Sequence, residues 1–185
     1  MTIVQGLIAS ISGGGATPLD PGFQFVDSNL SLGVNWTIEI IGSFNPTTYW
    51  ATIWGNEVWN SSQGHLAYLN GAQSLMVGAP NSENQYIVPE GFITKAYWVF
   101  THIDGGGIDV YRNGVLLTPY TTGYVQPSST ASNTLLYGAR HGNDGTGTAD
   151  PIGPATYDYY DAPSMAFDAT MIAQNYENLR ASYGI

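Results

Sequence analysis

The length of 185 residues suits a single domain, spanning residues 1–185, with one hydrophobic core. Hydrophobic residues make up 43% of the chain against 10% charged residues, which excludes a disordered polypeptide. Four Lys and Arg stand against 14 Asp and Glu, and the net charge of −10 disfavours nucleic acid and anionic membranes as partners. The absence of cysteine excludes disulfides and thiolate metal sites.

The first half of the chain predicts short strands separated by turns rich in glycine and proline. An N-terminal arm, residues 1–22, contains one strand and ends in a glycine run and a proline-rich turn. Residues 36–40 (Trp-Thr-Ile-Glu-Ile) alternate apolar and polar side chains, which predicts a strand with one apolar face. Residues 65–69 and 74–77 predict two further strands around Asn70-Gly71, a dipeptide that suits a two-residue type I′ turn.

The second half contains the strongest strand signals of the sequence. Residues 97–103, 108–112 and 115–117 predict three antiparallel strands. The first two are joined by Asp-Gly-Gly-Gly at 104–107 and the last two by Asn113-Gly114, and both connections have the chemistry of tight turns. We therefore expect a three-stranded meander over residues 97–117.

The end of the chain changes character after two more predicted strands, residues 134–139 and 155–160. Apolar residues recur at spacings of four, three and four from Ile172 to Tyr183, and Asp168 is a suitable N-cap. This pattern predicts a short amphipathic helix over residues 169–181. The chain as a whole predicts an all-β protein closed by one helix.

Two segments resemble a known family. Residues 98–114 (Trp-Val-Phe-Thr-His, then Asp-Gly, then Ile-Asp-Val-Tyr-Arg-Asn-Gly) resemble the core of laminin-G-like and concanavalin A-like domains, and residues 164–176 resemble their closing helix, with Met171 where Glu is usual. The resemblance extends over most of residues 23–180. It implies the two-sheet antiparallel jelly-roll sandwich of the concanavalin A-like lectin/glucanase superfamily, with a short C-terminal α-helix. This fold serves lectins, glycanases, adhesion modules and viral structural proteins, so it implies little about function.

The sequence shows no sign of a glycan-cleaving site. Glycoside hydrolysis needs two carboxylates flanking the scissile bond, and the Glu-x-Asp-x-x-Glu run that laminarinase-type relatives carry is missing. Asp158 and Asp161 are three residues apart, which on a regular strand sends them to opposite faces. No Gly-x-Ser-x-Gly elbow accompanies a histidine, and His102 is expected in a strand, bonded to a backbone group. We expect a protein without catalytic activity.

Aromatic residues between 49 and 59 form the first candidate ligand site. In an extended segment Trp50 and Trp54 share one face, and with Tyr49 they either stack on sugar rings or fill the core between the sheets. The core alternative is favoured for one of the two tryptophans. Trp59 lies among polar residues and is expected in an exposed loop, where it contacts a partner.

Tyrosine is the second aromatic signal, with 13 residues in the chain, more than one core can hide. Several fall in predicted loops, and Tyr157 and Tyr159 are taken as further candidate ligand-binding residues. The alternative is an outer sheet face rich in tyrosine, which β-propensity alone favours. The sequence leaves both alternatives open.

The loop after His141 is a candidate metal site. Domains of the resembled family often bind Ca²⁺ in loops at one rim, and Asn143, Asp144 and Asp150 supply three oxygen ligands of the right kind. The spacing matches no closed Ca²⁺ loop, and Asn-Asp-Gly is equally a good turn. A Ca²⁺ cofactor therefore stands beside a plain turn as the alternative.

The functional expectation combines this fold with missing export signals. The N-terminus lacks a basic n-region and a cleavage site, and no apolar run approaches the roughly 20 residues of a membrane span. We expect a phage-type virion surface or structural protein, a capsid decoration or tail component, made in the host cytoplasm. Its expected partners are other virion proteins, glycans or both, and either role accommodates a homo-oligomer. The alternative is a stand-alone carbohydrate-binding lectin module that depends on Ca²⁺.

Overall fold

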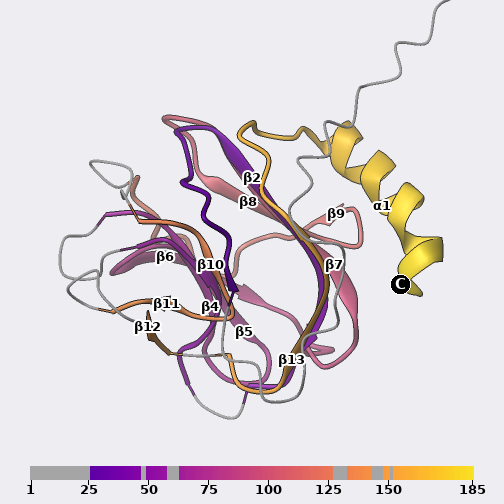
Figure 1. Cartoon of the computed structure of the whole chain (residues 1–185), viewed down its shortest axis with the longest axis horizontal. Helices are drawn as coiled ribbons and strands as arrows, with labels where there is room; N and C mark the ends of the chain where they lie inside the picture. The colour runs from indigo at the N-terminus through magenta and orange to yellow at the C-terminus, as the bar shows by residue number, and fades with distance from the viewer. Residues whose placement is uncertain (1–25, 47–48, 58–62, 127–132, 143–147, 151) are drawn as a thin grey trace, which may run out of the picture.

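The computed structural model describes residues 26–46, 49–57, 63–126, 133–142, 148–150 and 152–185. These residues form a sandwich of two antiparallel sheets, with one helix on the outside of one sheet (Figure 1). The predicted N-terminal arm and its strand lie outside the described residues. The described part of the chain contains no helix with the length and hydropathy that crossing a bilayer requires.

The first sheet has five strands and contains the predicted meander. Its order is β13 (Ala155–Asp161), β2 (Trp36–Phe44), β7 (Ala96–His102), β8 (Ile108–Arg112) and β9 (Val115–Leu116). Asn113 and Gly114, between β8 and β9, have φ of 50° and 78°, the positive values that the predicted tight turn requires. The meander over residues 97–117 is confirmed.

The second sheet has six strands. Its order is β1 (Val26–Asp27), β10 (Leu136–Tyr137), β3 (Ala51–Gly55), β4 (Leu66–Leu69), β5 (Ser74–Ala79) and β6 (Ser82–Ile87). A small ladder of β11 (Arg140–His141) and β12 (Thr148–Ala149) lies beside it.

The predicted type I′ turn between β4 and β5 is wrong. Leu69 pairs with Leu75, and the backbone N–H of Asn70 donates to the Ser74 carbonyl at 2.8 Å, so the loop is longer than two residues. Gly71 has a positive φ of 95°, but Asn70 does not share it. A type I′ turn needs positive φ at both positions.

The core between the sheets is built from large aromatic side chains. Trp36 of β2 and Trp54 of β3 are fully buried, and their rings meet edge to face with centroids 5.4 Å apart. Phe100 of β7 also meets Trp54 edge to face, with ring centroids 5.4 Å apart. Each such ring pair stabilises the fold by about 1 kcal/mol beyond the burial of its area. The alternation predicted for residues 36–40 is confirmed, since Trp36, Ile38 and Ile40 face this core.

A second apolar layer lies on the outer face of the five-stranded sheet. Helix α1 (Ala169–Tyr183) covers it, as Figure 1 shows, and packs Ile172 against Ile41, Tyr97 and Val99. The predicted N-cap is confirmed, because the Asp168 carboxylate accepts from the backbone N–H of Met171 at 2.9 Å. The outer face of the six-stranded sheet lies on the opposite side of the molecule from α1.

Candidate ligand-binding face

A bulge in β3 separates the two tryptophans that were expected to share a face. The pairing of β3 with β4 shifts register between Thr52 and Trp54, so the strict alternation along β3 is broken there. Trp54 therefore turns into the core and is fully buried, whereas Trp50 remains 45% exposed. The prediction that Trp54 contacts a ligand fails, because a buried ring offers no surface on which a ligand could stack.

Trp50 is held in a costly conformation immediately before β3. Its φ is +68°, in the left-handed region that bulky side chains rarely adopt, which costs about 1–2 kcal/mol. The Trp50 ring stacks on Tyr68 of β4, with centroids 4.9 Å apart and planes 23° apart. The Thr52 hydroxyl donates to the Trp50 carbonyl at 3.3 Å. Strain of this kind gathers at ligand-binding and catalytic positions, because selection retains it where it serves function.

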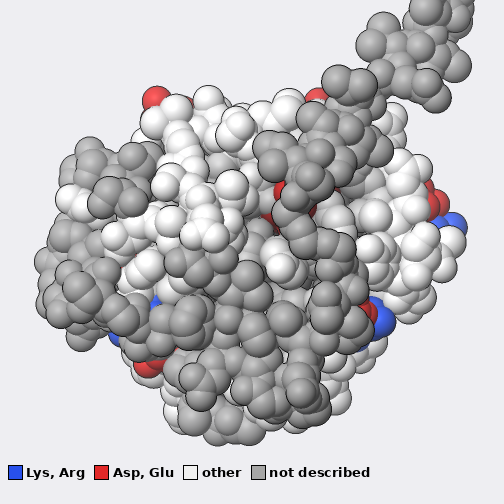
Figure 2. All heavy atoms as spheres, in the orientation of Figure 1, with Lys and Arg blue, Asp and Glu red and all other residues white. Residues whose placement is uncertain are grey.

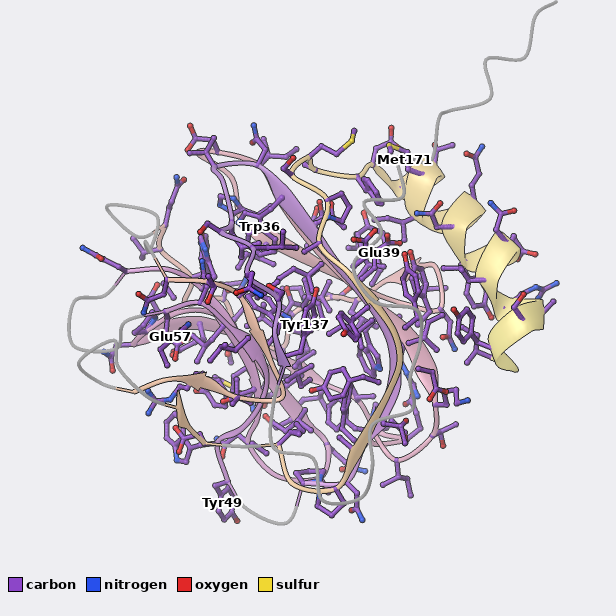
Figure 3. The ribbon with its side chains drawn as sticks, in the orientation of Figure 1. Trp36, Glu39, Tyr49, Glu57, Tyr137 and Met171 are labelled. Carbon is purple, nitrogen blue, oxygen red and sulfur yellow. The ribbon has the colours of Figure 1, made fainter. Side chains whose placement is uncertain are left out.

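Tyr49 lies beside Trp50 and is 72% exposed. Figure 3 shows its side chain projecting away from the body of the sandwich. Its ring approaches the loop between β4 and β5, because a Cβ atom at Gly71 would lie 3.8 Å from Tyr49 Cε1. Tyr49, predicted as a ligand-binding residue, is thus accessible and next to Trp50.

Polar side chains extend this surface across the sheet. Tyr68, Met76 and Gln85 are direct cross-strand partners on β4, β5 and β6, so their side chains form one row on the outer face. Tyr68 is buried beneath Trp50, while Met76 and Gln85 are half-buried. The Gln85 amide donates from Nε2 to the Ser74 hydroxyl at 2.8 Å, which fixes the orientation of the amide.

Glu83 provides a carboxylate at the same face, on β6 opposite Gly78. Its Oε1 accepts from the backbone N–H of Asn81 at 3.1 Å. Burial raises the pKa of Glu83, and burial together with the Glu83 carboxylate raises the pKa of Tyr68, so the phenol stays protonated. We call the surface formed by Tyr49, Trp50, Met76, Glu83 and Gln85 the aromatic face. It combines exposed rings with hydrogen-bonding groups, an arrangement that suits a ring compound bearing hydroxyls.

The other predicted aromatic contacts lie elsewhere. Tyr157 is buried in the core, where its hydroxyl donates to the Ile53 carbonyl at 2.8 Å, so the prediction that it contacts a ligand fails. Tyr159 is half-buried beside α1, with its ring 6.0 Å from that of Tyr183, on the sheet opposite the aromatic face. Trp59 lies outside the described residues.

Of the three predicted metal ligands, Asp150 lies within the described residues. Asn143 and Asp144 lie outside the described residues, and Asp150 accepts from Arg140 Nε at 2.6 Å. Within the described ranges, no cluster of three or more acidic, His or Cys side chains could hold a metal ion. The Ca²⁺ site therefore stays a prediction.

Arg140 also faces a buried acid that no sequence pattern singles out. Glu57 is fully buried, and its Oε1 lies 3.7 Å from Arg140 Nε without a hydrogen bond to either carboxylate oxygen. Burial raises the pKa of Glu57 to about 8, and the nearby guanidinium only partly opposes this. A Cβ at Gly55 would come within 2.5 Å of Glu57 Oε2, so a larger residue there would displace the Glu57 carboxylate. The cluster fixes β11 against the end of β3.

Two histidines meet at one end of the core around a tyrosine hydroxyl. Tyr124 Oη lies 3.1 Å from His65 Nε2 and 3.2 Å from His102 Nε2. His102 Nδ1 donates to the Val34 carbonyl at 2.9 Å, which confirms the expectation that His102 sits in a strand and bonds a backbone group. Because Nδ1 carries the ring proton, His102 Nε2 accepts from the Tyr124 hydroxyl. That hydroxyl has only one proton, so His65 Nε2 donates to its oxygen. Burial lowers the pKa of both imidazoles, that of His65 to about 3.

Two carboxylates lie close together beneath α1. Asp161 is the direct cross-strand partner of Glu39, and the Glu39 carboxylate accepts from Asn175 Nδ2 of α1 at 3.0 Å and from the Tyr97 hydroxyl. A bulge at Asp158 alters the alternation of β13, so the Asp158 side chain also lies on the side that α1 covers. There it pairs with Lys95, whose ammonium group also donates to the Tyr183 carbonyl of α1. The expectation that Asp158 and Asp161 point to opposite faces is therefore wrong. Glu39 is 2% exposed, which leaves a substrate no access to it.

No protein-family model matches the chain, and no curated protein is similar to it in sequence. Solved structures are similar in fold. The NanB sialidase of Streptococcus pneumoniae shares 13% identity at a TM-score of 0.63, over 86% of this chain and 27% of the sialidase. The CBM40 domain of the Ruminococcus gnavus IT-sialidase shares 10% at 0.57, over 87% of this chain and 99% of that domain.

A third similar structure is that of botulinum neurotoxin type C, whose cell entry depends on interaction with two ganglioside molecules. It shares 13% identity at a TM-score of 0.55, over 80% of this chain and 36% of the toxin chain. The chain thus spans about a quarter of the sialidase and about a third of the toxin chain. Together these likenesses confirm the predicted lectin-like jelly-roll sandwich, and at such low identity they establish the fold alone.

Proposed function

We propose that this chain is a non-enzymatic carbohydrate-binding domain whose aromatic face binds a glycan. The observation that carries the proposal is Trp50, a partly exposed indole held at φ +68° and stacked on Tyr68. Aromatic rings bind the apolar C–H faces of sugars, while amide and carboxylate groups beside them bind the hydroxyls. Gln85 and Glu83 supply such groups on the same face.

The fold comparisons support the proposal at a coarser level. A CBM40 domain and a toxin that interacts with gangliosides have the same architecture, although neither likeness transfers a residue to this chain. The absence of catalysis is also part of the proposal. Its support is that Glu39 and Asp161, the adjacent carboxylates beneath α1, face the helix and not the aromatic face.

Binding of a panel of oligosaccharides by isothermal titration calorimetry tests the glycan proposal. The Trp50→Ala variant should bind at least tenfold more weakly than the native chain, a loss of about 1.4 kcal/mol. Leu116→Ala is the matched control, because Leu116 is a 53% exposed apolar residue on β9 of the other sheet. Equal affinities of the Trp50→Ala variant and the native chain would exclude the aromatic face as the binding site.

We propose further that the domain acts at the surface of a virion, as a capsid decoration or a tail component. A chain without cysteine suits assembly in a reducing cytoplasm. Val115 and Leu116, 66% and 53% exposed on the edge strand β9, offer an apolar contact for another virion protein. Mass spectrometry of purified particles should then find the chain in stoichiometric amount. Its absence from particles, with glycan binding intact, would favour a stand-alone lectin module.

A further inference from the structure

Every Lys and Arg of the sequence is described, and each one faces a carboxylate. The four ion pairs join Lys95 to Asp158, Arg112 to Glu90, Arg140 to Asp150 at 2.6 Å and Arg180 to Glu177 at 3.0 Å. Figure 2 shows the same pattern on one face of the molecule, where each blue patch lies next to a red one. Each cationic side chain therefore already has a carboxylate partner within the chain.

Three of the four cations lie away from the aromatic face, and the fourth, Arg140, lies beside β3 but is almost buried in its ion pairs. Arg112 belongs to β8 and Lys95 directly precedes β7, both in the five-stranded sheet, and Arg180 lies on α1. Arg140, on β11, is 11% exposed and shared between Asp150 and Glu57. Recognition of a sugar carboxylate or sulfate normally relies on such guanidinium or ammonium groups.

The other usual anion-binding groups are already used. Helix α1, the one helix of the described residues, begins at the Asp168 carboxylate, which already accepts the backbone N–H of Met171. His65 and His102 are buried and neutral at pH 7, and His141 Nε2 lies 2.8 Å from the Thr134 carbonyl oxygen. None of these groups is available to neutralise an acidic sugar at the aromatic face.

The aromatic face itself favours hydroxyl groups over anions. Glu83 is an acceptor for sugar hydroxyls and repels a carboxylate or sulfate placed beside it. The net charge of −10 adds a long-range repulsion of the same sign. Local and global electrostatics therefore act in the same direction.

We infer that the aromatic face binds neutral glycans and discriminates against sialylated, sulfated and other acidic ones. This inference rests on the proposed function and adds the chemical class of its ligand. The likeness to the sialidase and to the toxin that interacts with gangliosides does not contribute to it, because that likeness carries no side chain over to this chain. The discrimination arises from the side chains of this chain and not from the backbone that it shares with them.

The test uses the full chain and matched pairs of oligosaccharides, each neutral core measured with and without a terminal sialic acid or a sulfate. Calorimetry at 50 mM salt should give a neutral form that binds at least tenfold more tightly than its acidic partner. The ratio should shrink as salt is raised, because screening weakens charge repulsion. Preferential binding of the acidic forms would overturn the inference and leave the proposed function standing. Binding to neither form would overturn both.

Two charge-reversal variants locate the source of the discrimination. Glu83→Lys should reduce the neutral-to-acidic affinity ratio by about tenfold, since it replaces a repulsive group by an attractive one at the face. Asp109→Lys is the control, because Asp109 is exposed on β8 of the other sheet and its replacement changes the net charge equally. Equal effects of the two variants would overturn the role of Glu83.

Discussion

The Tyr124 hydroxyl links His102 to His65 in a buried chain of hydrogen bonds at one end of the sandwich. Both imidazoles are more than 95% buried, and the Tyr124 hydroxyl lies within 3.2 Å of each Nε2. The backbone N–H of Tyr124 bonds the Asn84 side chain of β6, so the segment that carries Tyr124 is anchored to the edge of the six-stranded sheet. Protonation of the pair would place two like charges in the core.

The histidine pair predicts a loss of stability in acid. Burial lowers the pKa of His65 and His102 in the folded chain, so below pH 6.5 the unfolded state binds more protons than the folded state does. Each histidine then costs up to about 1.4 kcal/mol per pH unit. In urea unfolding measured from pH 7 to 4, the free energy of unfolding should fall less steeply for His65→Phe than for the native chain. Tyr124→Phe, which removes no titrating imidazole, should keep the native slope; an unchanged slope in His65→Phe contradicts the prediction.

Glu57 predicts the opposite pH dependence. Its pKa rises from 4.5 to about 8 on folding. The contribution of Glu57 to the free energy of unfolding is therefore fully present below pH 4.5 and is lost as pH rises through 8. The Glu57→Gln variant, which cannot ionise, should therefore be more stable than the native chain at pH 9 by about 1 kcal/mol or more. The difference should diminish toward pH 5 when unfolding free energies are compared. A native chain that is the more stable at pH 9 would mean that Arg140 outweighs the burial.

The strain at Trp50 predicts an inverted order of two substitutions. At a position with φ of +68°, glycine is unstrained, whereas alanine retains the left-handed penalty. Trp50→Gly should be more stable than Trp50→Ala by about 1 kcal/mol, the reverse of the usual order. Both variants lose the stacking on Tyr68 equally, so their difference in thermal unfolding isolates the backbone. A more stable alanine variant would contradict backbone strain at Trp50.

Helix α1 and the aromatic face should be energetically separate. Asp168→Ala removes the N-cap bond to Met171 and should lower the free energy of unfolding by about 1 kcal/mol, while Asp168→Asn retains most of it. Glycan affinity should not change in either variant, because α1 covers the opposite sheet. A parallel loss of affinity and stability would show that the two layers are coupled.

Elements specified by local signals were predictable from the sequence. The meander follows from turn residues such as Asn113-Gly114 and from strict alternation, and α1 follows from Asp168 and the spacing of its apolar residues. These signals act within a few residues of chain, so no knowledge of distant partners is required. The lectin-like sandwich follows from them together with the family resemblance.

The candidate site depends on features that alternation conceals. The bulges in β3 and β13 redirect Trp54 and Asp158, and a one-residue shift exchanges the two faces of a strand. The abundance of tyrosine has a related explanation. Of the two alternatives, the outer sheet face rich in tyrosine is found in part, because the outer layer under α1 receives Tyr97, Tyr111 and part of Tyr159. Which strand face a helix covers is set by tertiary packing and leaves no local trace.

The position of α1 has a practical consequence for measurement and for assembly. The chain ends beside α1, on the side of the molecule opposite the outer face of the six-stranded sheet (Figure 1). Copies tethered through residue 185 would therefore all present Tyr49 and Trp50 outward, in one orientation. A lattice of such copies would gain avidity for clustered ligands without any change in single-site affinity. Attachment through the aromatic face would cover the binding surface, and the same array would bind no ligand.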